Sequence, residues 1–141
     1  MSRWTCPHCD REFARRHQAH VCVPGGTVEA TFAGRAPAQR AAYDAMLAHL
    51  RRLGPVHEDA VAVGVFLKQE RKFAEVRPSA GGLRVWLLLP GPLVHARFDR
   101  TVRAAAGRYA HRLTLRTAAE VDGELLGWLT RAYHAAGPGP G

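Results

Sequence analysis

The spacing of apolar residues changes twice along this chain, and this change limits the folds it can adopt. Between residues 38 and 53 apolar side chains recur every three or four positions, the period of a helix with one buried face. Between residues 61 and 89 they alternate with other residues or form short runs, which is typical of strands. A second helical pattern closes the chain after residue 117. The order helix, strands, helix predicts an α+β domain.

Glycine, proline and charged residues divide the middle of the chain into short segments. The predicted strands are 61–67, 73–77, 83–89 and 109–116. The sequence Thr117-Ala118-Ala119-Glu120 is a capping-box pattern, and we expect it to open the last helix. The sequence therefore predicts a two-layer α+β domain with a four-stranded antiparallel sheet and flanking helices.

All the cysteines and three of the eight histidines lie between residues 6 and 22. Cys6 and Cys9 form a CxxC knuckle whose sulfurs can bind one ion, and zinc accepts mixed sulfur and imidazole ligands. Cys22 can complete the site with His20, separated from Cys9 by ten residues, or with His17, separated from Cys9 by seven. The longer gap leaves room for a strand, a turn and a short helix. We predict a structural Zn²⁺ site formed by Cys6, Cys9, His20 and Cys22, with His17 as the alternative.

Two glycine- and proline-containing joints separate this cluster from the predicted domain. They are Pro24-Gly25-Gly26 and the segment 34–37. Val28 and Phe32, four residues apart, predict one helical turn between the joints. We expect a zinc-finger-like module over 1–23, a linker over 24–37, the α+β domain over 38–136 and a flexible tail over 137–141.

The chain carries a formal net charge of +8, which favours polyanionic partners such as nucleic acid. Arginine supplies most of this charge in a composition rich in alanine and glycine, typical of GC-rich genomes, so the placement of the charges matters more than their sum. Strand alternation places Leu83, Val85, Leu87 and Leu89 on the core side of the sheet and basic residues around an aromatic ring on the other. The predicted basic surface comprises Lys68, Lys72, Arg84, Trp86, Arg112 and Arg116.

A basic sheet face around an aromatic side chain can stack a base and bind phosphates. Arg15 and Arg16 of the small module can add phosphate contacts. We therefore expect a zinc-binding accessory protein that contacts the DNA or RNA backbone with little sequence specificity. Two other interpretations stay open: a merely solvated sheet face, and an adaptor that docks a protein partner through the finger and the exposed Trp86 region.

No catalytic constellation is recognisable in the sequence, and we expect no enzymatic activity. The chain lacks the spacing of a phosphate-binding loop, and neither Ser2 nor Ser79 lies in a nucleophile elbow. The acids of segment 57–59 can in principle bind a metal with His57, but acids at such positions are more often surface turn residues. His111 shares the core-side register of Leu113, so we expect it to be buried with hydrogen-bonded ring nitrogens.

The apolar run at 85–90 is far shorter than the roughly 18 residues that a membrane span requires. The N-terminal residues contain no apolar signal-peptide region. The cysteine cluster has no partners for a disulfide framework in the rest of the chain and suits a reducing compartment. We therefore expect a soluble cytoplasmic protein.

Two stretches of the chain carry a resemblance to a known family: FLKQERKFAEVRPSAGGLRVWLLLPG (66–91) and YAHRLTLRTAAEVDGELLGWLTRAYH (109–134). With them the chain resembles a small bacterial domain family of unknown function, sometimes labelled a predicted transport protein. In that family a basic turn, an F-A-x-V strand and a G-L-x-hydrophobic strand precede a further strand and a closing helix. The family has been seen beside restriction and nuclease modules, so the resemblance implies a nucleic-acid context.

The N-terminal segment resembles versions of this family that carry C-P-x-C-x-R-x-F-x-R…Q-x-H-x-C. The pattern matches this chain at Cys6, Cys9, His20 and Cys22 and at the intervening arginine, phenylalanine and glutamine positions. The resemblance implies His20 rather than His17 as the third zinc ligand. Asp10 stands where such knuckles usually have glycine.

Overall fold

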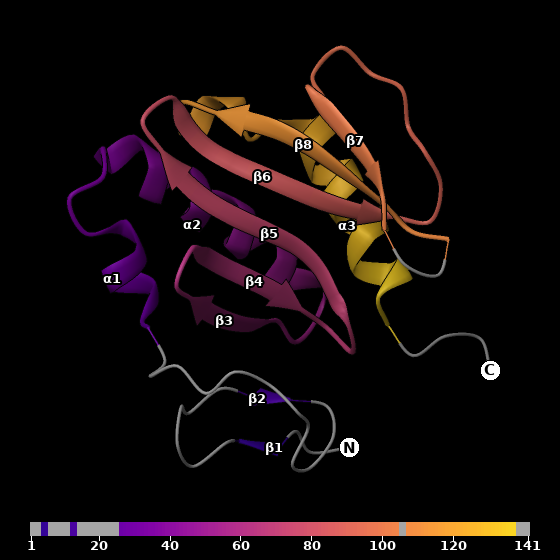
Figure 1. Ribbon diagram of the computed structural model, residues 1–141, viewed down its shortest axis with the longest axis horizontal. Helices are drawn as coiled ribbons and strands as arrows, with labels where there is room; N and C mark the ends of the chain where they lie inside the picture. Colours follow the sequence, from indigo (N-terminus) through magenta and orange to yellow (C-terminus); the bar gives the residue numbers. More distant parts are fainter. Residues whose placement is uncertain (1–3, 6–11, 14–25, 105–106, 138–141) are drawn as a thin grey trace.

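A six-stranded antiparallel sheet with helices packed against it dominates the computed structural model, which describes residues 4–5, 12–13, 26–104 and 107–137 (Figure 1). This arrangement confirms the predicted α+β class. In the N-terminal part, β1 (Trp4–Thr5) pairs antiparallel with β2 (Glu12–Phe13). The remaining predicted residues of the zinc-finger-like module lie outside the described residues: Cys6, Cys9, Arg15, Arg16, His17, His20 and Cys22.

The elements of the larger domain follow the chain in a simple order. Its helices are α1 (Val28–Phe32), α2 (Pro37–Leu53), the 3-10 helix η1 (Ala118–Glu120) and α3 (Gly123–Ala135). Its strands are β3 (His57–Val61), β4 (Gly64–Lys68), β5 (Lys72–Ser79), β6 (Gly82–Leu89), β7 (Arg100–Arg103) and β8 (Tyr109–Leu115). The spatial order is β3-β4-β5-β6-β8-β7.

The first two helices form as the sequence predicts. Thr27 caps α1 by accepting a hydrogen bond from the Ala30 backbone N–H at 3.0 Å, and Phe32 packs on Tyr43 of α2 with ring centroids 5.2 Å apart. Pro37 begins α2, where its missing N–H costs nothing. The buried face of α2 holds Tyr43, Met46, Leu47 and Leu50, as the periodicity predicts.

One face of the sheet builds the core. Helices α2 and α3 lie behind the strands in Figure 1, and both contact β6. The core-facing side chains of β6 and β8 are fully or almost fully buried: Leu83, Val85, Leu87, Leu89, Leu113 and Leu115. His111 is 0% exposed, its Nε2 accepts the Leu93 backbone N–H at 2.9 Å, and its Nδ1 lies 3.4 Å from the Leu87 carbonyl. The predicted buried and hydrogen-bonded histidine is therefore confirmed.

The sheet has six strands, so the prediction of four was wrong. The segment 61–67, predicted as one strand, contains a hairpin in which Ala62 and Val63 form the turn between β3 and β4. These two residues carry none of the usual turn signals, and apolar alternation continues through them. Gly64 permits the fold here, because a Cβ at this position would lie 2.0 Å from the Val76 carbonyl oxygen.

Strand β7 was also missed, because the segment around it was predicted to be irregular. All four of its residues are exposed, and β7 is an edge strand that pairs with β8 alone. An exposed edge strand leaves no apolar alternation in the sequence, and its arginines protect the edge from pairing with another chain.

The capping box opens η1 rather than the last long helix. Both of its reciprocal hydrogen bonds, between Thr117 and Glu120, are present. Asp122 then caps α3 by accepting the Leu125 backbone N–H at 3.1 Å. The buried face of α3 comprises Leu125, Trp128, Leu129, Ala132 and Tyr133. Among the described helices, none is both long and apolar enough to cross a membrane.

Candidate nucleic-acid interface

The sheet face opposite the core presents a row of aligned side chains. The register pairs Phe66 with Glu75, Glu75 with Trp86, Trp86 with Arg112, and Arg112 with Arg100, so one row crosses β4, β5, β6, β8 and β7. A parallel row joins Leu88, Ala110 and Val102. Because side chains alternate along strands, both rows lie opposite the core leucines and away from α2 and α3 (Figure 1).

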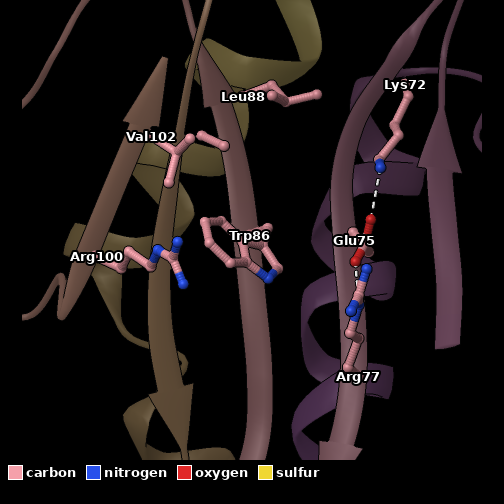
Figure 2. Close-up of a pocket in the computed structure, with 8 residues that line it drawn as sticks. Lys72, Glu75, Arg77, Trp86, Leu88, Arg100 and Val102 are labelled. Carbon is pink, nitrogen blue, oxygen red and sulfur yellow. Dashed lines mark hydrogen bonds and ion pairs between the residues drawn. The ribbon is translucent and has the colours of Figure 1, made fainter. Parts of the chain in front are cut away.

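A hollow of about 360 Å³ lies on this face and is lined by Lys72, Glu75, Arg77, Trp86, Leu88, Arg100, Val102 and Ala110. Figure 2 shows Trp86 in the middle, with Arg100 and Val102 on the β7 side and the β5 residues on the other. A hollow of this size is at the lower end of the range for small-ligand sites. It combines an aromatic ring, short apolar walls and basic side chains.

Glu75 lies on the β5 side of the hollow and is only 5% exposed. Its carboxylate accepts hydrogen bonds from Lys72 Nζ at 2.5 Å and from Arg77 Nε, as the dashed lines in Figure 2 show. Lys72 Nζ also lies 3.9 Å from the centroid of the Phe66 ring. The three charged groups keep a net charge of +1, so this wall attracts anions while the buried carboxylate is satisfied.

A shift in register allows Lys72 and Glu75 to share a face although they are three residues apart. Leu67 pairs with Ala74 whereas Lys68 pairs with Lys72, which leaves Phe73 without an opposite residue. Phe73 is fully buried and packs edge-on against Tyr133 of α3, with ring centroids 5.5 Å apart. The irregularity therefore anchors β5 in the core and turns Lys72 toward the hollow.

Trp86 is half-buried and is supported from β8. The Arg112 guanidinium lies 5.6 Å from the indole centroid, and Arg112 Nε donates to Asp99 Oδ1 at 2.7 Å. Arg112 is not among the residues that line the hollow. It therefore holds the tryptophan from outside, and the ring remains accessible from the hollow.

Arg100 supplies the cation on the β7 side. Within the described part of the chain its guanidinium makes no hydrogen bond or ion pair. The preceding segment is fastened to α3, since Arg97 donates to Asp122 at 2.8 Å, to Glu124 at 3.2 Å and to the Glu120 carbonyl at 2.9 Å. This anchor holds the approach to β7, so Arg100, which has no partner among the described residues, lies on a fixed strand.

The contacts between Arg97 and the start of α3 also shift the pKa values of Asp122 and Arg97. The hydrogen bond from the Leu125 backbone N–H and the neighbouring Arg97 guanidinium lower the pKa of Asp122. The partly buried Arg97 has its pKa raised because the hydrogen bonds and charges of Asp122 and Glu124 outweigh its desolvation. Both groups therefore stay charged at neutral pH.

The structure places five of the six predicted surface residues on the open face, and the sixth follows the end of β8. Lys72, Arg84, Trp86 and Arg112 share the open face, and exposed Arg84 lies between Arg77 and Thr114 in the register. Lys68 lies opposite Lys72 in the register but does not line the hollow, and its Nζ donates to buried Asp59 at 2.7 Å. Exposed Arg116 follows the end of β8, where its backbone N–H donates to Glu120.

The sequence interpretation did not include Glu75, Arg77, Arg100 or Val102. The alternation of Glu75 and Arg77 with Val76 inside a predicted strand was a usable signal for the first two. No comparable signal marks Arg100 and Val102, because their position depends on the pairing of β7 with β8.

The sequence favours surface turn positions for Glu58 and Asp59, and this prediction was wrong, because both acids lie in β3 and have structural partners. Glu58 accepts from the Tyr43 hydroxyl at 2.7 Å and from Arg51 at 2.5 Å. Burial, together with the hydrogen bond to Glu58, raises the pKa of Tyr43. Asp59 is 7% exposed and pairs with Lys68. No group of three or more histidine, cysteine or acidic side chains among the described residues is arranged to hold a metal ion.

Comparison with known proteins agrees with the extent of this domain. No curated protein and no solved structure matches the chain. A family model described as a domain of unknown function (DUF5655) matches residues 28–136, which include every helix and strand from α1 to α3 and the whole hollow. The match covers well over half of the sequence, and the chain therefore belongs to the DUF5655 family.

Proposed function

We propose that this protein binds nucleic acid through the open face of its sheet and acts as a non-enzymatic accessory protein. The observation that carries the proposal is the position of Trp86 within a hollow bordered by Lys72, Arg77 and Arg100. An aromatic ring among cations is the combination that single-stranded nucleic-acid sites use, with rings for bases and cations for phosphates.

The balance of charge on this face supports a polyanionic partner. Lys72, Arg77, Arg84, Arg100 and Arg112 oppose two carboxylates, those of Glu75 and Asp99, which leaves an excess of three positive charges. The Lys68–Asp59 ion pair on the same face adds no net charge. Arg84 and Arg100 are the strongest candidates for phosphate contacts, because neither guanidinium has an ion-pair partner among the residues that the structure describes.

The same geometry favours binding with little sequence specificity. Phosphates and the faces of bases are common to all sequences, whereas base edges carry the sequence information. Both oxygens of Glu75, the buried acceptor in the hollow, are engaged by Lys72 and Arg77. The site therefore offers a ring and positive charge rather than a pattern of free donors and acceptors.

The proposal includes a bound zinc ion, and the support for it is the spacing of Cys6, Cys9, His20 and Cys22 in the sequence. Such a module would add Arg15 and Arg16 to the basic surface of the protein. Its metal would have a structural role, because all four ligands come from the protein and no position is left open for a substrate.

The test is fluorescence anisotropy of zinc-supplemented protein with short labelled DNA and RNA over a series of salt concentrations. We expect Arg84→Glu/Arg100→Glu to weaken binding and to reduce the slope of log affinity against log salt by about 1.4 to 1.8, the contribution of two phosphate contacts. The matched control is Arg35→Glu/Arg131→Glu, which makes the same change in net charge at two exposed arginines off this face.

Equal loss in the test and control pairs would overturn the proposed location, since it would show a response to net charge alone. Absence of binding at low salt would overturn the function itself. A protein partner whose binding depends on Trp86 but not on salt would favour the alternative, an adaptor that docks through the Trp86 region.

A further inference from the structure

We infer that the hollow holds one unpaired nucleotide, with its base stacked on Trp86 and its phosphate at Arg100, so that the protein prefers single strands to duplexes. This inference rests on the proposed function and adds to it the strandedness of the partner and the position of one base. It is carried by the size of the hollow, the exposure of the ring and the distribution of paired and unpaired cations.

The size of the hollow fits one nucleotide rather than the side of a double helix. Its volume of about 360 Å³ lies between strand β5 and edge strand β7, with Trp86 between the two walls. A base inside a duplex is covered on both faces by its neighbours and cannot offer a face to Trp86. An unpaired base can leave the stack and place its ring in the hollow.

The surroundings of Trp86 suit the flat face of a base. Leu88, Ala110 and Val102 form the apolar side of the hollow next to the indole, and Val102 is 39% exposed. Arg112 contacts Trp86 from the neighbouring strand without lining the hollow. The ring is therefore held in place before a ligand arrives, which limits the side-chain entropy lost on binding.

The cations divide into a paired set and an unpaired one. Lys72 and Arg77 are held on Glu75, whereas the Arg100 guanidinium has no partner within the described ranges. A phosphate at Arg100 gains a charge-assisted hydrogen bond without breaking an existing ion pair. Glu75, Lys72 and Arg77 together contribute a net positive charge at the opposite wall, where the bound nucleic-acid strand can continue past Arg77.

The ion pairs of Glu75 also predict that the hollow discriminates little between bases. Its carboxylate is already bound by two cations, so it has little capacity to select bases with an amino group. Stacking tolerates every base. We therefore expect the affinities of oligomers of dT, dC and dA to lie within about tenfold of one another.

The test compares a single-stranded oligonucleotide with its own duplex, for wild type, Trp86→Leu and Trp86→Phe, by fluorescence anisotropy at one salt concentration. We expect wild type to bind the single strand about tenfold more tightly, which corresponds to one stacked base. Trp86→Leu should lose this preference and retain its affinity for duplex. Trp86→Phe, which keeps an aromatic ring of smaller size, should retain most of the preference and shows that the site is still folded.

The outcomes separate this inference from the proposed function. One result would overturn the unpaired-nucleotide site but leave a basic nucleic-acid face. In it, wild type binds single and double strands with equal affinity, Trp86→Leu binds both as wild type does, and Arg84→Glu/Arg100→Glu binds neither. No binding of either form by wild type would overturn both. A preference for the duplex would also contradict the hollow as the site of a base.

Discussion

Trp86 on β6 lies directly opposite Arg112 on β8, and the Arg112 guanidinium is 5.6 Å from the centre of the indole ring. Asp99 accepts a hydrogen bond from Arg112 Nε at 2.7 Å, and the Asp99 backbone N–H donates to the Arg112 carbonyl at 2.9 Å. A chain of contacts therefore runs from the segment before β7 through Arg112 to Trp86. This chain fixes the ring on which the proposed function depends.

Removing Arg112 should cost stability as well as affinity. We expect Arg112→Ala to lower the free energy of unfolding by about 1 kcal/mol, the sum of one cation–π contact and one partly exposed ion pair. Urea denaturation measures this change. Arg116→Ala is the control, because Arg116 is exposed and its side chain makes no ion pair among the described residues, and it should shift stability by less than about 0.5 kcal/mol. Equal losses in the two variants would contradict the role of Arg112 as a support.

Glu75→Gln should change stability and affinity in opposite directions. The buried carboxylate accepts hydrogen bonds from Lys72 and Arg77, whose side chains are partly exposed, so we expect a loss of about 1 to 3 kcal/mol in the free energy of unfolding. The same change removes one negative charge from the hollow and should tighten nucleic-acid binding. Urea denaturation and anisotropy measure the two effects.

The control for Glu75 is Glu29→Gln, which removes one negative charge from an exposed site on α1. It should leave stability nearly unchanged and tighten binding much less, because it lies off the open face. Weaker binding by Glu75→Gln at temperatures where it is fully folded would contradict the proposed role of the hollow.

Gly64 and Gly127 should respond to the same substitution with opposite signs. A Cβ at position 64 would meet the Val76 carbonyl oxygen at 2.0 Å, so we expect Gly64→Ala to destabilise the domain by about 2 to 4 kcal/mol. A Cβ at position 127 in α3 meets nothing within 4 Å, and alanine there should stabilise the helix by about 0.5 to 1 kcal/mol. Thermal and chemical denaturation measure both. A tolerated alanine at position 64 would contradict the close pairing of β4 with β5.

The lowered pKa of Asp122 predicts a loss of stability in acid. A carboxyl group whose pKa is lower in the folded state stabilises the fold above its unfolded pKa of about 3.8, and this contribution disappears as the pH falls through the folded pKa. Asp122→Asn should therefore lower Tm at neutral pH, and the difference from wild type should narrow below about pH 4. A difference that stays constant with pH would contradict the ionised cap.

The predicted zinc site includes a choice between two histidines, which can be tested. We expect wild-type protein to contain about one zinc ion per chain, His20→Ala to lose it and His17→Ala to retain it, because only His20 leaves the longer gap after Cys9. Elemental analysis of purified protein measures the ratio. Retention of zinc by His20→Ala together with its loss from His17→Ala would reverse the assignment.

The parts of the fold that bury one regular face could be predicted from the sequence. Helix α2 places Tyr43 and Met46 in the core at helical spacing, and β6 places Leu83 and Val85 there at strand spacing. The hairpin at Ala62-Val63 lacks turn residues, and β7 has no buried face. Local periodicity carries no information about either feature.

The candidate site divides in the same way. Arg84 and Trp86 could be placed on the open face because they alternate with buried residues of β6. The contact of Lys72 with Glu75 depends on the irregular register of β5, and the position of Arg100 depends on long-range pairing with β8. Strand alternation specifies the face of a residue, whereas its neighbours depend on the register.

The most direct test of the central claim is a ¹H–¹⁵N NMR titration of the protein with a short single-stranded oligonucleotide. The chain has three tryptophans, and the indole resonance of Trp86 can be assigned by its absence from the spectrum of Trp86→Phe. We predict that this resonance and the amides of β5, β6 and β7 around the hollow shift progressively, while the indole of buried Trp128 does not. Shifts confined to the exposed faces of α2 and α3, or no shifts at all, would contradict a nucleic-acid site on the open face of the sheet.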